Sequence, residues 1–145
     1  MSNGDLLIET RWRYVVDDYN HDRFHNQIAQ YFKNLVPSTG FRSIFVDNKK
    51  QVWFIGHDNQ LFLQDFDNHR LYNPFRNVSL EKGGVSDIIH SNRLYRVLYR
   101  SGIIEYYNDN DFSLEFHNEY LVGKMPPDDI ILHLFVDREN DLWVY

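Results

Sequence analysis

The chain has 145 residues, carries 15 Lys and Arg against 21 Asp and Glu, and contains no cysteine. With 43% hydrophobic and 17% aromatic residues it has enough apolar material for the core of one domain, so disorder is not expected. A net charge of −6 argues against sequence-independent binding to nucleic acid or to an anionic membrane, and the absence of cysteine excludes disulfides, thiolate metal sites and cysteine nucleophiles.

Internal repetition dominates the sequence, and its first trace lies in residues 1–36. At an offset of 47 residues, the apolar segment 14–16 matches segment 61–63. Residues 1–36 are therefore predicted to be the C-terminal part of one repeat unit, followed by a connector. In the connector, a short helix is an alternative to extended chain, because three apolar residues have helical spacing: Ile28, Phe32 and Leu35.

Residues 37–84 are predicted to form a complete unit of four short strands. The apolar segments are four to six residues long and are separated by turns rich in Asn, Asp and Gly, which is typical of an all-β protein. Several segments are apolar at consecutive positions, which indicates a sheet that is covered on both faces. The expected strands are Phe41–Val46, Val52–Ile55, Leu61–Asp65 and Arg70–Asn73.

Residues 127–145 are predicted to begin a fourth unit, because they match segment 37–55 at an offset of 90 residues without a gap. The match contains five identities in nineteen positions, one of them the pair Trp53 and Trp143. Because this offset is twice a plausible repeat length, a third unit is expected between the two, and residues 85–126 contain it in a weaker form. The repeat length is then about 42–47 residues, which is typical of propeller repeats.

Nine residues define the repeat, and we expect their role to be structural. The aromatic residue of the second strand is expected to pack between sheets rather than to stack on sugars, and Tyr95 is expected to take the tryptophan position in the third unit. Two glycines are predicted to occupy hairpins that require a positive φ, Gly56 and Gly102. The full set is Ile44, Asp47, Trp53, Gly56, Tyr95, Gly102, Leu134, Asp137 and Trp143.

Four-stranded sheets that repeat at this length and cover one another are the blades of a β-propeller. About three units cannot close a ring that needs at least four blades. The expected fold class is therefore all-β, an open β-propeller fragment of four-stranded antiparallel blades. Uncovered blade faces and unpaired edges in such a fragment predict self-association.

No motif predicts catalysis or cofactor binding. A Gly-rich phosphate loop, a His-Glu-x-x-His pair and a Gly-x-Ser-x-Gly elbow are all missing from the sequence. The seven histidines occupy unrelated places in the repeat, and the pairs of Asp recur in turns that lack the glycine of a calcium loop. We therefore expect satisfied or surface histidines and solvated acidic turns, with no catalytic residue, no cofactor and no metal.

One exposed aromatic residue is a candidate contact for a ligand or partner. Trp12 lies between Arg11 and Arg13 at the tip of an expected hairpin. A tryptophan flanked by cations suits a carbohydrate or a protein surface. A tip that folds back onto the protein is the alternative.

The repeat resembles that of a known family. Segments 44–56 and 134–144 share a pattern: an apolar pair, an Asp, a polar turn, and then an apolar-Trp-apolar strand. After the first of them comes segment 61–66, an apolar strand that ends in an aromatic residue. This pattern is similar to the two-component regulator propeller repeat. The usual glycine of the first turn is replaced here by Lys50 and Asn140.

The resemblance implies a location and a function. In that family, such repeats form the extracytoplasmic sensor of bacterial hybrid histidine kinases, commonly tied to the use of polysaccharides. The expected role is a non-catalytic, periplasmic sensor module of an inner-membrane protein, which detects an oligosaccharide as part of the full propeller and relays the signal to the kinase. No segment approaches the ~20 consecutive apolar residues of a membrane span, so direct membrane insertion is not expected.

Two alternatives from other classes stay open. A propeller-type lyase or glycosidase would gather carboxyl groups at the mouth of the channel, and one of them would have a raised pKa. A protein-interaction scaffold without a small ligand would need neither carboxyl groups nor a sugar site.

Overall fold

The computed structural model describes residue 35 and residues 37–65, 67–75, 82–127 and 130–145, together with the backbone of three strands nearer the N-terminus. Within these residues the protein is all-β and has no α-helix, so the predicted fold class is confirmed. The described part of the chain also contains no helix that is long and apolar enough to cross a membrane. Most of the connector, with its alternative helix, lies outside the described residues.

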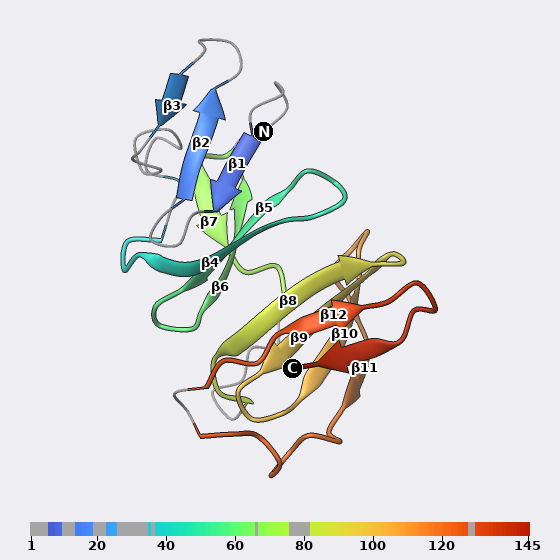
Figure 1. Ribbon diagram of the computed structural model, residues 1–145. Coiled ribbons are helices and arrows are strands. Elements are labelled where there is room, and N and C mark those ends of the chain that lie inside the picture. Colours follow the sequence, from blue (N-terminus) through green and yellow to red (C-terminus); the bar gives the residue numbers. More distant parts are fainter. Residues whose placement is uncertain are drawn as a thin grey trace.

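Four antiparallel sheets follow one another along the chain, and none of them closes (Figure 1). The first sheet contains β1 (Leu6–Glu9), β2 (Tyr14–Asp18) and β3 (Arg23–His25). The second contains β4 (Phe41–Val46), β5 (Val52–Gly56), β6 (Leu61–Asp65) and β7 (Arg70–Tyr72). The third contains β8 (Val85–Ser91), β9 (Leu94–Tyr99), β10 (Ile104–Asn108) and β11 (Leu114–Asn118). The last contains β12 (Leu134–Val136) and β13 (Leu142–Val144).

Each strand pairs with the next one along the chain, so every sheet is a simple meander. In Figure 1 the N-terminal strands lie at the top, β4–β7 lie below them, and β8–β11 lie in the lower part, where β12 runs beside β8. In the second sheet the observed strands differ from the predicted ones by one residue at the ends of β5 and β7. The sheets together form an open, propeller-like fragment.

The hydrophobic core lies between neighbouring sheets, which stack face to face. We call the side of a sheet that faces the next sheet along the chain its forward face, and the opposite side its rear face. Trp53 and Ile55 on the forward face of the second sheet pack with Tyr95 and Val97 on the rear face of the third. The rear face of β12–β13 packs on the third sheet through Leu134, Leu142 and Val144.

Burial on both faces explains the consecutive apolar residues of the strands. All five residues of β5 are buried, because the forward face packs on the third sheet while Val52 and Phe54 pack with Leu35 on the rear face. The sequence pattern thus follows from the stacking of sheets.

The strand register repeats between units and changes one assignment made from the sequence. Phe45 lies opposite Trp53 in the second sheet, and Phe135 lies opposite Trp143 in the last. In the third sheet the corresponding pair is Ile89 and Arg96. The residue at the tryptophan position is therefore Arg96 and not Tyr95.

The physical reason is the length of the turn between β8 and β9. Asn92 and Arg93 form a two-residue turn with φ of 50° and 64°, the conformation that tight hairpins favour. Relative to the second unit, the chain is shortened here by one residue, whereas Tyr95 could hold the tryptophan position only if it were shortened by two. A shift of one residue moves a side chain to the other face, so Tyr95 points to the second sheet.

The turns also test the predictions about glycine. Gly102 has a φ of 93°, and a Cβ at this position would lie 2.5 Å from the backbone of Leu121, so a side chain is excluded. The prediction of a positive φ is wrong for Gly56, because Asn59 takes that conformation in its hairpin, with a φ of 61°. Asn tolerates this region of φ better than other non-glycine residues do.

Candidate interaction surface

An aspartate organises the turn between the first two strands of a unit. Asp47 Oδ1 accepts hydrogen bonds from the backbone N–H of Lys49 and of Gln51, both at 2.9 Å. Its Oδ2 accepts a hydrogen bond from the indole Nε1 of Trp53, also at 2.9 Å. Lys50 completes the turn with a φ of 66°, a conformation that glycine adopts most easily. The carboxylate therefore fixes both the turn and the orientation of the indole ring.

The same arrangement occurs in the last unit. Asp137 Oδ1 accepts a hydrogen bond from the N–H of Asp141 at 2.8 Å, and Oδ2 accepts one from Trp143 Nε1 at 2.7 Å. Asn140 takes the place of Lys50, with a φ of 70°. The hydrogen bond from the indole holds the pKa of Asp137 below its ordinary value. The spacing of six residues between Asp and Trp is therefore the distance that this hairpin requires.

The two tryptophans differ in what covers them. The ring of Trp53 is fully buried, with the ring centroids of Tyr95 and Phe75 at 5.0 and 5.5 Å. The hydroxyl of Tyr95 also donates a hydrogen bond of 2.6 Å to Asp47 Oδ2, so this contact links the second and third sheets. Trp143 is instead 57% exposed.

Two neighbouring aromatic residues share the exposure of Trp143. Phe135 is 52% exposed and Tyr145 is 70% exposed, and both lie on the forward face of β12–β13. We call Phe135, Trp143 and Tyr145 the open face. Its residues occupy the positions that Phe45, Trp53 and Ile55 hold in the second sheet, where the third sheet covers them.

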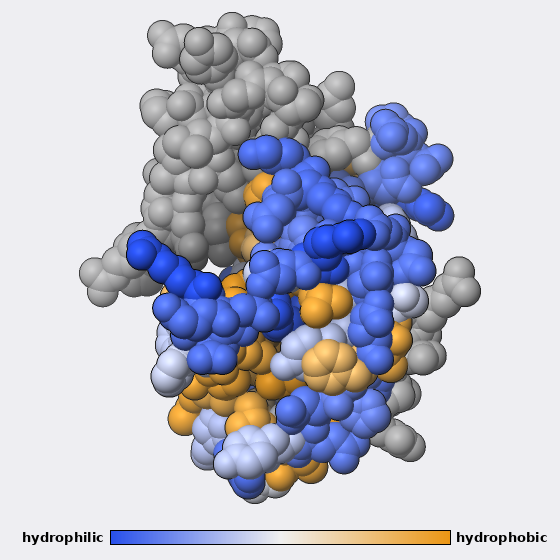
Figure 2. Space-filling view, turned by 90° about the vertical axis from the view of Figure 1, so that its right-hand side faces the viewer, coloured by the Kyte–Doolittle hydropathy of each residue, from blue (hydrophilic) through white to orange (hydrophobic). Residues whose placement is uncertain are grey.

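Apolar side chains reach the surface in the lower half of Figure 2, at the height of the third and last sheets in Figure 1. Besides the open face, the exposed large side chains include Leu114, Phe116 and Val122, on and after the outer strand β11. An exposed apolar patch is typical of an interaction site. We therefore regard the forward side of this part of the molecule as the candidate interaction surface.

A polar network between the second and third sheets contains a buried histidine. His90 Nδ1 accepts a hydrogen bond from the N–H of Asn48 at 3.2 Å, so the ring proton lies on Nε2, which donates to Asp109 Oδ2 at 3.1 Å. Both ring nitrogens are thus used within the fold, which leaves no position for a metal ion. Within the described residues, no three metal-ligating side chains come together.

Asp109 differs from the solvated turn that the sequence predicts, because it is buried. Burial alone would raise the pKa of this carboxyl group. The hydrogen bond from His90 and the positive charge of Lys49, whose Nζ lies 3.4 Å from Oδ1, outweigh burial. The pKa of Asp109 therefore lies below its ordinary value. Asp65, Asp67 and Asp111 have the expected turn positions, with Asp67 and Asp111 exposed. The side chains of the pairs at 17–18 and 128–129 lie outside the described residues.

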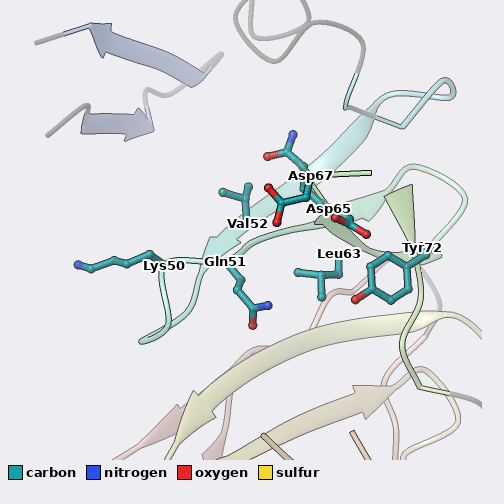
Figure 3. A pocket seen from close by; sticks show the side chains of 8 residues that line it. Lys50, Gln51, Val52, Leu63, Asp65, Asp67 and Tyr72 are labelled. Atoms are coloured by element: carbon teal, nitrogen blue, oxygen red, sulfur yellow. The ribbon is translucent and has the colours of Figure 1, made fainter. Parts of the chain in front are cut away.

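A shallow hollow of about 280 Å³ lies at the end of the second sheet. Figure 3 shows Asp65 and Asp67 near its centre, Tyr72 at one side and Lys50 extending away from it. The Asp65 carboxylate accepts hydrogen bonds from the amide of Asn68 and the guanidinium of Arg70, at 2.9 and 3.0 Å, and these lower its pKa. Asp65 is therefore held as a carboxylate, which cannot act as a general acid.

Neither models of protein families nor curated proteins match this chain. The remaining candidate from the sequence, Trp12 with Arg11 and Arg13, lies outside the described residues. Sequence reasoning missed the contact between Tyr95 and Asp47 and the burial of Asp109 beside His90. No local signal could reveal either one, because the first joins two units and the second joins residues 19 positions apart, one on β8 and the other directly after β10.

Three buried tyrosines lead to a prediction about alkaline pH. Burial, with hydrogen bonds to neighbouring oxygens, raises the pKa of Tyr95, Tyr99 and Tyr107 well above the ordinary value of 10.0. The neutral phenols thus stabilise the fold fully below pH 10, and this stability is lost as the pH rises further, because the unfolded chain ionises first. We expect phenolate absorbance from these residues to appear together with loss of the β-sheet circular dichroism signal. Ionisation of all phenols with an intact β-sheet signal would contradict this prediction.

Proposed function

We propose that this chain is a non-catalytic sensor and interaction module, and that it forms part of the extracytoplasmic β-propeller of a bacterial hybrid two-component system. The observation that carries the proposal is the repeated Asp–Trp hairpin, in which Asp47 with Trp53 and Asp137 with Trp143 make the same hydrogen bond. These residues are also those by which the sequence resembles the two-component regulator propeller repeat. A tandem array of stacked sheets supplies extended surfaces for binding, which suits a sensor.

In this proposal the complete propeller binds a glycan-derived ligand in the periplasm and relays the binding to a histidine kinase. The ligand class is supported by the resemblance alone, since a fold by itself does not determine function. In this proposal the ligand site is formed by loops of several blades, and the open face is not part of it.

The alternative of a propeller enzyme has less support. Glycoside cleavage requires one carboxylic acid whose pKa is raised, so that it carries a proton near neutral pH. Among the described carboxyl groups, those with a shifted pKa are all shifted downward: Asp65, Asp109, Asp111 and Asp137. This pattern is typical of structural hydrogen bonding in turns.

The test is calorimetry of the complete sensor region that contains this chain, titrated with a panel of oligosaccharides. We expect one glycan class to bind and to change the phosphorylation of the attached kinase. The absence of binding across a broad panel would exclude a glycan as the ligand. Kinase phosphorylation that responds only to a protein partner would favour the alternative of a protein-interaction scaffold without a small ligand.

Two variants refine this test. Trp12→Ala removes the contact residue that the sequence predicts, and it should weaken glycan binding if the site includes this hairpin. Tyr120→Ala is the matched control, because Tyr120 is a 72% exposed aromatic residue in a different turn. Equal binding by both variants and the unchanged protein would exclude Trp12 from the site.

A further inference from the structure

The open face has a regular arrangement of apolar and polar groups along the hairpin β12–β13. Phe135 and Trp143 lie opposite each other at its centre. Tyr145 is two residues beyond Trp143 at one end, and Asp137 is two residues beyond Phe135 at the other. Because a strand rises about 3.3 Å per residue, the phenol and the carboxylate lie at similar distances, about 7 Å along the strands, on opposite sides of the centre.

The second and third sheets show how a carboxylate in this position is used. Asp47 Oδ2 receives the indole N–H of its own hairpin and, at 2.6 Å, the hydroxyl of Tyr95 from the sheet that covers it. Asp137 Oδ2 receives the equivalent indole N–H from Trp143. Within the described residues no hydroxyl reaches this oxygen, so it has the capacity to accept one more hydrogen bond.

The hairpin that carries the open face is held in place from behind. Leu134 is buried, and Leu142 and Val144 pack with it against the third sheet. Leu134 N–H also donates a hydrogen bond of 2.8 Å to Asp87 on β8. A partner would therefore meet a preformed surface, which lowers the entropic cost of association.

We propose that the open face binds a second copy of this chain, with the two hairpins face to face and related by a two-fold axis across the strands. Such an axis places Tyr145 of each copy over Asp137 of the other, which gives two equivalent contacts. It also brings Phe135 and Trp143 of the two copies together in the middle. Each Tyr145 hydroxyl then donates to Asp137 Oδ2 of the second copy, as Tyr95 does to Asp47.

Self-complementarity is the reason to choose a second copy as the occupant. A two-fold interface uses the same patch on both chains, so each donor needs an acceptor at the mirrored position, and the hairpin supplies both. Three aromatic side chains, each more than half exposed, supply roughly 300–400 Å² of accessible surface per copy that the dimer could bury. The total of roughly 600–800 Å² is below the ~1,200 Å² of a stable specific complex, so the dimer should be weak and form only at high concentration. The proposal does not depend on the proposed function.

Sedimentation equilibrium of the chain, from about 10 µM to about 1 mM, tests the proposal, because weak interfaces of this size fall in that range. We expect a monomer–dimer equilibrium. Tyr145→Phe removes only the hydroxyl, and it should weaken the dimer about tenfold or more by deleting two hydrogen bonds to a carboxylate. Trp143→Ser should abolish dimerisation. Tyr120→Ser is the control, because Tyr120 is 72% exposed, close to the 70% of Tyr145, and lies in a turn outside the open face, so its loss should leave the dimer intact.

Three outcomes would overturn the proposal. The unchanged protein could remain monomeric up to the highest concentration. Its dimer could be insensitive to Tyr145→Phe and Trp143→Ser. The chain could also form open-ended oligomers, which would indicate head-to-tail stacking of different faces instead of a closed dimer. Circular dichroism of each variant, compared with the unchanged protein, distinguishes a lost contact from a lost fold.

Discussion

Replacement of Trp53 by alanine is expected to lower the free energy of unfolding by about 3–5 kcal/mol, the usual cost of deleting a fully buried aromatic side chain. The indole lies between two sheets, against Tyr95 and Phe75, and it is fully buried. Its removal leaves a cavity at the centre of the core that joins the second and third sheets. It also removes the hydrogen bond to Asp47, whose carboxylate orders the turn.

Trp143→Ala is the matched control for this variant. Trp143 has the same place in the strand register and the same hydrogen bond to an aspartate, but its ring is 57% exposed. We expect only a small fraction of the loss seen for Trp53→Ala, since little apolar surface returns to water. The comparison thus separates the effect of the covering sheet from that of the hairpin itself.

Urea unfolding followed by circular dichroism measures both variants, because the midpoint and the slope together give the change in stability. A similar loss for the two replacements would mean that the hairpin hydrogen bond, and not burial between sheets, supplies the stability. That result would also remove the physical basis for treating the sheets as a stacked array.

The strands and the repeat could be predicted from the sequence because both depend on local patterns. Each strand of the second unit is a short apolar run between turn residues, and the Asp–Trp spacing of the hairpin recurs after 90 residues. At the turn position where the repeat that the sequence resembles has a glycine, Lys50 and Asn140 adopt the positive φ that glycine would supply. The information for these features lies within one unit.

Register and contacts between units could not be predicted in the same way. Tyr95 and Arg96 are adjacent, and only the length of the preceding turn decides which of them faces the second sheet. A one-residue difference in a weakly similar unit is not visible in composition or periodicity. The hydrogen bond from Tyr95 to Asp47 joins residues 48 positions apart, so it depends on how whole sheets stack.

The Arg96 side chain shows what the change of register does to the next interface. It donates a hydrogen bond of 3.0 Å to Asn140 in the last unit, and its guanidinium lies 5.6 Å from the centre of the Tyr106 ring. Burial lowers the pKa of Arg96 from its ordinary value. A cation that lies over an aromatic ring thus takes, in the third sheet, the place that the buried indole has in the second.

A buried ion pair in the third sheet leads to the second large effect. Glu105 is only 2% exposed, and its carboxylate accepts hydrogen bonds from Lys82 Nζ and from the hydroxyl of Tyr107. We expect Lys82→Met to cost about 3–5 kcal/mol of the free energy of unfolding, because it leaves a buried negative charge without its cation. Urea unfolding at neutral pH measures this loss.

The double variant Lys82→Met with Glu105→Gln should recover most of that loss, since the amide is neutral and can still accept the hydrogen bond from Tyr107. Arg70→Met is the control on the surface, where it breaks the ion pair with Asp65 at 3.0 Å and should change stability little. Additive losses in the double variant would contradict the prediction, because they would mean that the charge on Glu105 is not the source of the cost. Recovery would show instead that this buried pair is held together by the need to neutralise one charge, and that the surrounding aromatic core tolerates its removal.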